Sequence, residues 1–264
     1  MGWGMSNQPC AIIRTMGPEL HQTWMNHLEE LRKRLIVALA ALGVSTVGAF
    51  FYSDRILEVV SRPITRVIGQ VYFFSPADAF MIKIKVSILA GFLLALPVMF
   101  GELWGFVAPG LRPNEKKWIL PLAFVSSFFF LAGVLFAYCE VIPPALQFFI
   151  GQQTEFLKPM VSMTEYVSFL SGMLLAFGVA FNLPVAVVGL VWAGILSVKT
   201  LNKFQRHAIL MIFIASAILT PSPDAASQLF LAVPLLGLFE LSIGVSWIIE
   251  RMKSKRTQVM VPHE

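Results

Sequence analysis

The chain has few charged residues and few cysteines, and these shortages exclude several classes of function. Of its 264 residues only 13% are Asp, Glu, Lys or Arg, and it contains two cysteines and four histidines. The cysteines and histidines are scattered along the sequence, without the spacing of metal ligands. A phosphate-binding loop, a dinucleotide fingerprint and a nucleophile elbow are also missing. The sequence therefore predicts neither a metal nor a cofactor, and it does not favour an enzyme.

Apolar residues are abundant instead. They make up 57% of the chain, with 23 phenylalanines and a mean hydropathy of +0.75, which is typical of an integral membrane protein. A helix needs about 20 mostly apolar residues to cross a bilayer. We expect six such helices: Leu35–Tyr52, Val86–Val107, Trp118–Tyr138, Tyr166–Ala193, Ala208–Thr220 and Leu229–Ile249. The fifth is short, which predicts local bilayer thinning or protein cover beside it.

The distribution of positive charge predicts the orientation of these spans. Cytoplasmic connections of membrane proteins carry an excess of Lys and Arg. Of the 20 Lys and Arg residues, 14 fall at the two termini and in the second-to-third and fourth-to-fifth connections. The other side carries Arg55, Arg62, Arg66, Lys83, Lys85 and Lys158. Both termini are therefore expected in the cytoplasm. The net charge of +5 reflects this topology, and nothing favours nucleic acid as a partner.

No linker or break in composition divides the spans, so we expect one polytopic all-α domain over residues 1–264. Residues 1–24 form a variable cytoplasmic tail and residues 253–264 a cytoplasmic C-terminal tail. Prolines recur inside the spans, and each removes a backbone hydrogen bond and can bend its helix: Pro97, Pro121, Pro143, Pro144, Pro184 and Pro234. This pattern favours a bundle of kinked helices with a concave face, although membrane helices also tolerate proline without special purpose.

Glu30 and Glu115 are the strongest candidates for ligand binding. Glu30 lies just before the first span, and Glu115 lies in the cytoplasmic turn after the second, so both belong to the same membrane surface. Each carboxylate could take an arginine guanidinium as a bidentate pair. The local alternative is that Glu30 pairs with Arg34 four residues later and that Glu115 pairs with a neighbouring lysine.

Three polar residues fall inside predicted spans: Glu102, Asn182 and Glu240. A buried carboxylate is costly in a membrane and is a functional hypothesis by default. Glu102 is near the cytoplasmic end of its span and could reach the interface. Glu240 has no cation close in sequence, so it is protonated, paired across helices or in contact with water. Asn182 precedes Pro184 and could satisfy a carbonyl that the proline leaves free.

The turn between the last two spans is also polar. Thr220, Asp224 and Gln228 lie in or beside the segment Thr-Pro-Ser-Pro-Asp. Thr220 and Gln228 could offer hydrogen bonds to a partner helix at membrane depth. They could equally cap their own helices, and the sequence leaves both interpretations open.

Four motifs in order resemble the TatC family, the multi-spanning receptor subunits of the twin-arginine protein translocase. They are His27-Leu-Glu-Glu-Leu-Arg-Lys-Arg-Leu35, Leu96-Pro-Val-Met-Phe-Gly-Glu-Leu-Trp-Gly-Phe-Val-Ala-Pro-Gly-Leu111 followed by Glu115, Phe177-Gly-Val-Ala-Phe-Asn-Leu-Pro-Val185, and Leu219-Thr-Pro with Asp224 and Ser227-Gln228. The six expected spans and the cytoplasmic termini agree with this resemblance. It covers about Trp24 to Lys253.

The resemblance implies a glove-shaped bundle in the bacterial cytoplasmic (inner) membrane. Its concave face would bind the signal peptides of folded cargo, with consecutive arginines held by Glu30 and Glu115, and with Arg32 and Phe106 on the same surface. Pro63, in the outer loop, would be sensitive to change. The resemblance also implies an oligomeric receptor complex in contact with lipid, and export driven by the proton motive force without a nucleotide.

The turn carrying Thr220, Asp224 and Gln228 would contact single-span partners of the TatA and TatB type. One departure from the family pattern is Asn182, where many members carry Glu or Gln. Because its side chain is a neutral amide, it can form hydrogen bonds but cannot carry a proton. The main alternative to a translocase is a small-solute secondary transporter, which would place a midplane site at broken helices such as those of Asn182 and Glu240. A membrane enzyme would need clustered acids or histidines at one depth.

Overall fold

The computed structural model describes residues 18–107, 119–151, 160–192, 198–219 and 225–258. Within these ranges the chain is helical apart from short connections. Two of these connections are joined by an isolated β-bridge between Tyr72 and Ser162. The elements are α1 Pro18–Phe50, α2 Ser53–Ile68, α3 Pro76–Val107, α4 Ile119–Phe136, η3 Ala137–Val141, α5 Ile142–Gly151, α6 Met163–Trp192, α7 Val198–Leu219 and α8 Ala225–Gln258.

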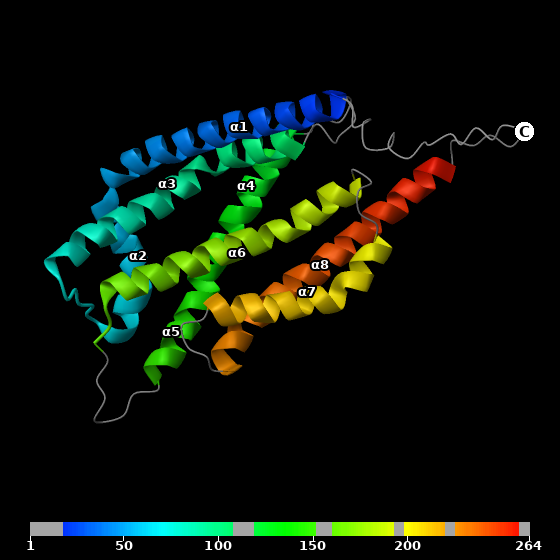
Figure 1. Cartoon of the computed structure of the whole chain (residues 1–264). Helices are drawn as coiled ribbons and strands as arrows, with labels where there is room; N and C mark the ends of the chain where they lie inside the picture. Colours follow the sequence, from blue (N-terminus) through cyan, green and yellow to red (C-terminus); the bar gives the residue numbers. More distant parts are fainter. Residues whose placement is uncertain (1–17, 108–118, 152–159, 193–197, 220–224, 259–264) are drawn as a thin grey trace, which may run out of the picture.

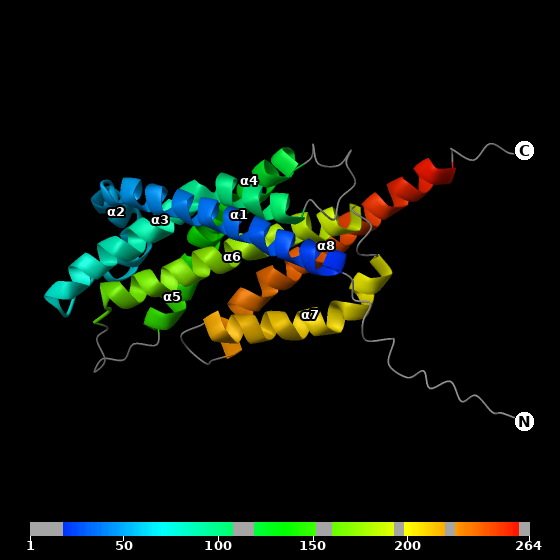
Figure 2. The same cartoon turned by 45° about the horizontal axis from the view of Figure 1, so that its top comes forward.

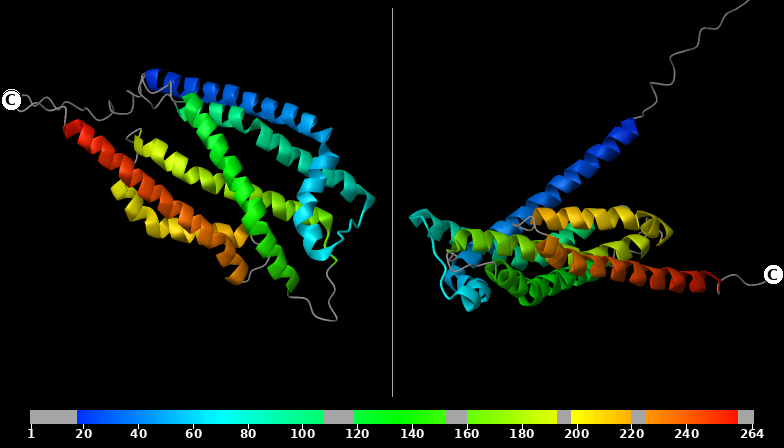
Figure 3. Two further views of the ribbon diagram at one scale, coloured as in Figure 1. Left: turned by 180° about the vertical axis from the view of Figure 1, so that it is seen from behind. Right: turned by 90° about the horizontal axis from the view of Figure 1, so that it is seen from below.

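The long helices run back and forth, so that α1 begins and α8 ends at the same end of the bundle (Figure 1). Helix α1 packs chiefly against α3, and α7 and α8 pack against each other and against α6. Figure 2 shows α7 beside α8 on the far side of α6 from α3 and α4. Seen from below, α1 slants away from the layer that holds α6, α7 and α8 (Figure 3).

Four stretches are long and apolar enough to cross a membrane: Leu28–Phe50, Pro76–Phe106, Leu120–Gly151 and Met163–Leu190. A shorter apolar stretch, Ala232–Ile248, lies in α8. The protein is thus an all-helical, multi-pass membrane protein. The first three predicted spans are found as longer stretches, and the fourth is found at the same length, shifted three residues towards the N-terminus. The predicted fifth span falls mainly on α7, where the described residues hold no stretch of that length and hydropathy.

Glycines allow two of the helix pairs to approach closely. A Cβ placed on Gly91 of α3 would lie 2.6 Å from the backbone N and Cα of Thr46 on α1. Where α4 crosses α6, a Cβ on Gly133 would lie 2.5 Å from the carbonyl oxygen of Phe177. Gly178 of α6 likewise receives the ring of Phe130. These contacts bring backbones together as small residues do in membrane bundles.

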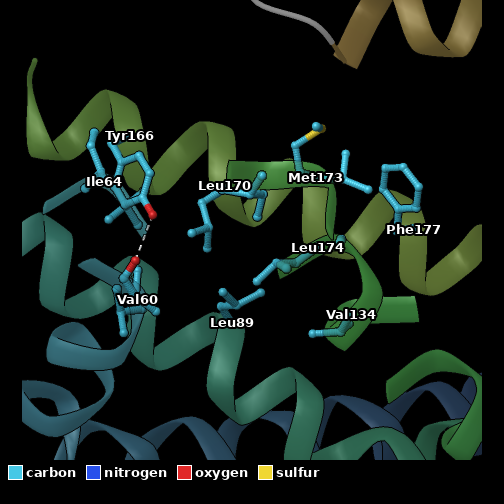
Figure 4. Close-up of a cluster of buried hydrophobic side chains, with 14 of the residues drawn as sticks. Val60, Ile64, Leu89, Val134, Tyr166, Leu170, Met173, Leu174 and Phe177 are labelled. Carbon is cyan, nitrogen blue, oxygen red and sulfur yellow. Dashed lines mark hydrogen bonds between the residues drawn. The ribbon is translucent and has the colours of Figure 1, made fainter. Parts of the chain in front are cut away.

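A cluster of buried hydrophobic side chains joins α2, α3, α4, η3, α5, α6 and α8 (Figure 4). Leu89, Leu170 and Phe177 meet in it, all at most 5% exposed. The hydroxyl of Tyr166 donates a hydrogen bond to the carbonyl of Val60 across this core at 2.8 Å. The cluster therefore fixes the connection after α1 onto the membrane-spanning helices.

The connection after α1 is a helix, and the expectation that Pro63 lies in a loop is wrong. Pro63 is buried inside α2. A proline inside a helix leaves the carbonyl four residues earlier without its donor. That carbonyl belongs to Val59, and the Tyr138 hydroxyl donates to it at 2.6 Å. At the start of α3, Ser75 and Asp78 cap the helix reciprocally: the Ala77 N–H donates to the Ser75 hydroxyl, and the Ser75 N–H to the Asp78 carboxylate.

The expectation that Pro121 bends its helix needs correction. Pro121 lies in the first turn of α4, where a proline removes no helical hydrogen bond, so it gives no reason for a bend. Pro143 and Pro144 cannot donate to the carbonyls of Cys139 and Glu140, and the wider π-helical turn η3 forms at those residues. Cys139 is exposed.

Candidate functional site

The predicted acid Glu30 lies on α1 and is paired with Arg34. The Arg34 guanidinium donates to Glu30 Oε1 from Nη2 at 2.5 Å and from Nε at 3.2 Å. This is the local i,i+4 pair that the sequence left as the alternative. The Glu30 side chain is nevertheless 37% exposed, so the pair leaves the carboxylate open to solvent. The local pair and access for a ligand therefore coexist.

Arg34 also reaches α3. Its Nη1 lies 3.6 Å from Glu102 Oε2 and donates to the Glu102 carbonyl oxygen at 3.5 Å. Glu102 is consequently an ion-pair partner of Arg34. No local pattern in the sequence indicates this partner, because Arg34 and Glu102 are 68 residues apart.

Gly105 makes room for this arrangement. It is buried on α3, and a Cβ built on it would overlap Nη1 of Arg34. Gly101, one turn earlier on the same helix, has nothing within 4 Å of such a Cβ. The guanidinium thus lies in the space beside Gly105, and a larger residue there would displace the tip of the Arg34 side chain. Sequence reasoning missed Gly105, which has no chemistry of its own.

The residues around Glu30, Arg34 and Glu102 lie at one end of the neighbouring helices α1 and α3. Arg32 is exposed and lies between Glu30 and Arg34 in the sequence, and Phe106 is partly exposed at the end of the second apolar stretch. Trp104 anchors this end of α3 to α4, because its indole N–H donates to the Ser126 hydroxyl at 2.9 Å. The structure therefore brings Glu30, Arg32 and Phe106 to the same end of the bundle. Glu115 lies outside the described residues, as do Thr220 and Asp224.

Asn182 does not bond the carbonyl that Pro184 leaves free, although its position in the sequence suggests this role. The carbonyl that Pro184 leaves free is that of Ala180, four residues before it. The Asn182 amide instead donates to the Gly178 carbonyl at 3.1 Å. Its Oδ1 atom is buried and has no hydrogen-bond partner in the described part of the chain.

Glu240 is paired across helices, which was one of three expectations for it. Its Oε1 atom accepts a hydrogen bond from the Gln205 amide of α7 at 2.5 Å. Gln228 of α8 likewise donates to the Phe213 carbonyl of α7 at 2.9 Å. Gln228 thus links α8 to α7, and this hydrogen bond does not cap the end of either helix. Both contacts lie on the pair of helices that ends the chain.

Comparison with known proteins identifies the group to which this arrangement is similar. The family model described as Sec-independent protein translocase protein (TatC) matches residues 26–234. The TatC protein of Desulforapulum autotrophicum is 41% identical over 220 residues, covering 82% of this chain and 81% of that protein. The TatC protein of Carboxydothermus hydrogenoformans is 38% identical over 228 residues, covering 86% of this chain and 94% of that protein.

Solved structures agree. A crystal structure of the twin arginine translocase receptor TatC superimposes with a TM-score of 0.75 at 34% identity, covering 84% of this chain and 98% of the other. A second crystal structure of that receptor, in DDM, gives a TM-score of 0.77 at the same identity, covering 83% and 99%. The match therefore extends from the sequence motifs to the arrangement of the helices.

Proposed function

Since this chain belongs to the TatC family of Sec-independent protein translocase proteins, we propose that the α1–α3 end of the bundle binds the consecutive arginines of a signal peptide. Glu30 and Glu115 hold the two guanidinium groups, and Arg32 and Phe106 line the same surface. The observation that carries the proposal is that the Glu30 carboxylate already accepts two N–H donors of one guanidinium, that of Arg34. Its geometry suits arginine, whose planar fork offers several donors at once.

The depth of these residues supports the proposal. The first apolar stretch starts at Leu28 and the second ends at Phe106, so Glu30 and Phe106 mark the same end of two antiparallel spans. A carboxylate at this level meets water and headgroups, where a charged ligand remains solvated until it binds. The apolar part of the signal peptide can then extend along α1, whose Leu35, Leu39 and Val44 are exposed.

The chain works in a Tat complex, and we assign its partners from the family resemblance. It forms six spans with both termini in the cytoplasm, in a kinked, glove-shaped bundle of the bacterial inner membrane. Single-span proteins of the TatA and TatB type dock at the α7–α8 end, with Thr220, Asp224 and Gln228 at the contact. The complex exports folded cargo with the proton motive force. The antiparallel course of the helices and the shared end of α1 and α8 support this topology.

Site-specific crosslinking tests the binding site. A photoreactive residue replaces Phe106 in membranes that carry the full chain, and a signal peptide bearing Arg-Arg or Lys-Lys is offered. We expect crosslinking to the Arg-Arg peptide, and its loss on Glu30→Ala or Glu115→Ala. Glu29→Ala is the matched control, because Glu29 is next in sequence but pairs with Lys33 at the exposed surface. Equal crosslinking to both peptides, or loss with the control as well, would refute the assignment.

A further inference from the structure

The end of the bundle that carries α2 holds several cations that the proposed function leaves unused. It is the opposite end from the proposed arginine site, because α1 runs the length of the bundle before α2 begins (Figure 1). Four exposed residues of α2 follow one another at intervals of four, three and four: Arg55, Val59, Arg62 and Arg66. Residues at this spacing lie on one face of a helix, so the three arginines form a row along α2.

Tyr138 connects this row to the helix formed by α4, η3 and α5. Its hydroxyl donates to the Val59 carbonyl at 2.6 Å, and the positive charges of Arg62 and Arg66 both act on the Tyr138 side chain. Helix α2 also packs against α5 (Figure 3). The exposed acid Glu140 is two residues further along and projects from roughly the opposite side of its helix. Two arginines and one tyrosine therefore gather where α2 meets η3.

An apolar stripe on α4 leads to the same place. Its exposed side chains again follow at intervals of four, three and four: Phe124, Phe128, Leu131 and Leu135. Tyr138 comes three residues later, so the stripe from Phe124 to Tyr138 is about 21 Å long at about 1.5 Å per residue. The hydrocarbon of one membrane leaflet is roughly half of a 30 Å core. The stripe is thus long enough for an acyl chain, and it ends at a tyrosine, a residue typical of the headgroup level.

Both arginines are available to an anion. Within the described ranges Arg66 is exposed and has no ion pair, and Arg62 pairs with Glu58 at 3.1 Å. The side chains of Arg62 and Glu58 are each more than half exposed, and such a surface pair contributes little to stability. A phosphate can therefore replace Glu58 at small cost. The planar guanidinium group suits phosphate oxygens, to which it can donate two parallel hydrogen bonds.

We propose that Arg62 and Arg66, together with the apolar stripe of α4, bind an anionic phospholipid. Its phosphate lies against the two guanidinium groups, and an acyl chain lies along the stripe. Charge complementarity selects an anionic lipid, because the headgroup of a zwitterionic lipid carries an ammonium group that the arginines repel. The stripe selects a lipid over free phosphate, which would leave the apolar side chains without a ligand. This site is independent of the proposed signal-peptide site, which lies at the other end of the bundle.

The test is lipid crosslinking on the full chain in nanodiscs. A photoreactive residue replaces Leu135, and the nanodiscs contain phosphatidylglycerol and phosphatidylcholine with the same acyl chains. We expect phosphatidylglycerol to be crosslinked about fivefold above its share of the lipid, the effect of one cation at a membrane surface. A photoreactive residue at Leu94 of α3, which is also exposed, should report the bulk ratio.

The double variant Arg62→Gln/Arg66→Gln should return the enrichment at Leu135 to the bulk ratio. Arg55→Gln is the matched control, since Arg55 belongs to the same exposed row but precedes Arg62 by about 10 Å along the helix. Equal losses in Arg55→Gln and in the double variant would overturn the proposal, as would equal enrichment at Leu94 and Leu135. Displacement by added glycerol phosphate, or crosslinks to a second copy of the chain in place of lipid, would also overturn it.

Thermal unfolding separates lipid binding from a structural role of the arginines. A ligand that binds the folded state raises the unfolding temperature. Phosphatidylglycerol should therefore stabilise the parent chain and not the double variant, while the two chains unfold alike in phosphatidylcholine alone. An equal gain in both chains would overturn the proposal. If the double variant is unstable in phosphatidylcholine, Arg66→Gln alone repeats the crosslinking without breaking an ion pair of the described chain, and unaltered enrichment there would overturn it.

Discussion

The hydroxyl of Tyr138 donates to the carbonyl oxygen of Val59 at 2.6 Å, and this is the carbonyl that Pro63 deprives of its helical donor. A typical hydrogen bond contributes about 0.5–1.5 kcal/mol to stability. Tyr138 thus supplies the donor that Pro63 removes from the middle of α2, and it joins α2 to η3.

Tyr138→Phe should lower the free energy of unfolding by about 1 kcal/mol, because the Val59 carbonyl loses its donor. In a Pro63→Ala background the restored backbone N–H can bond that carbonyl, so the cost of Tyr138→Phe should shrink. The measurement is a double-mutant cycle on unfolding of the full chain in detergent. Tyr72→Phe is the control, since the Tyr72 hydroxyl bonds the exposed side chain of Gln70. Additive costs of Tyr138→Phe and Pro63→Ala would contradict the pairing.

The contact of α1 with α3 gives a second prediction. A Cβ at Gly91 would lie 2.6 Å from backbone atoms of Thr46, which cannot move aside as a flexible side chain can. Gly91→Ala should therefore destabilise the bundle by about 1–3 kcal/mol through overpacking. Gly43→Ala on α1, where a Cβ meets nothing within 4 Å, should be neutral or stabilising by up to about 1 kcal/mol. Thermal unfolding of both variants tests this prediction. Equal stability of Gly91→Ala and Gly43→Ala would mean that the helices can separate at Gly91 without cost.

The sequence predicted those features of the fold that depend on local patterns. Apolar runs located four of the membrane spans. The full length of α2 could not be predicted, because Pro63 reads as a helix breaker when its tertiary partner Tyr138 is not known. The end of the chain was harder, because α7 is less apolar than α3, α4 and α6 and its predicted span is short.

The candidate site was predictable in its residue types but not in its connections. Glu30 stands out because charge is rare beside an apolar run, and its pair with Arg34 follows from helical spacing. The contact with Glu102 could not be predicted, since it depends on how α1 crosses α3 at Gly91. Gly105 has no signal in a single sequence. The resemblance to a translocase, and not the polar residues alone, distinguished a protein translocase from a solute transporter, and the family match confirms that choice.

The pair of Gln205 and Glu240 leads to a third prediction. The carboxylate accepts a hydrogen bond from a neutral amide across α7 and α8, so an amide oxygen at the same place can accept it too. Glu240→Gln should leave unfolding nearly unchanged, whereas Glu240→Leu and Gln205→Leu should each destabilise by about 1 kcal/mol and should not be additive. Signal-peptide binding should survive all three changes. Its loss in Glu240→Gln at full stability would show that the charge itself is required.

Helix α7 supplies the last prediction, on how the membrane is prepared for a folded protein. Its described residues contain no stretch apolar enough to span a bilayer unaided, and a short span thins the membrane around it. Inserting four leucines between Leu210 and Met211 lengthens α7 by about one turn, or roughly 6 Å, and nearly preserves the faces of the helix on either side. Both flanking residues are exposed, so part of the added turn faces away from the core. If thinning lowers the barrier for cargo, export should stop in membranes with an intact proton motive force, while Arg-Arg crosslinking at Phe106 persists, because that site lies on α3.

Inserting four serines at the same point is the matched control for length without hydropathy, and it should retain more export than the leucines. Export that continues unchanged with the four leucines would show that cargo crosses without help from a thinned bilayer.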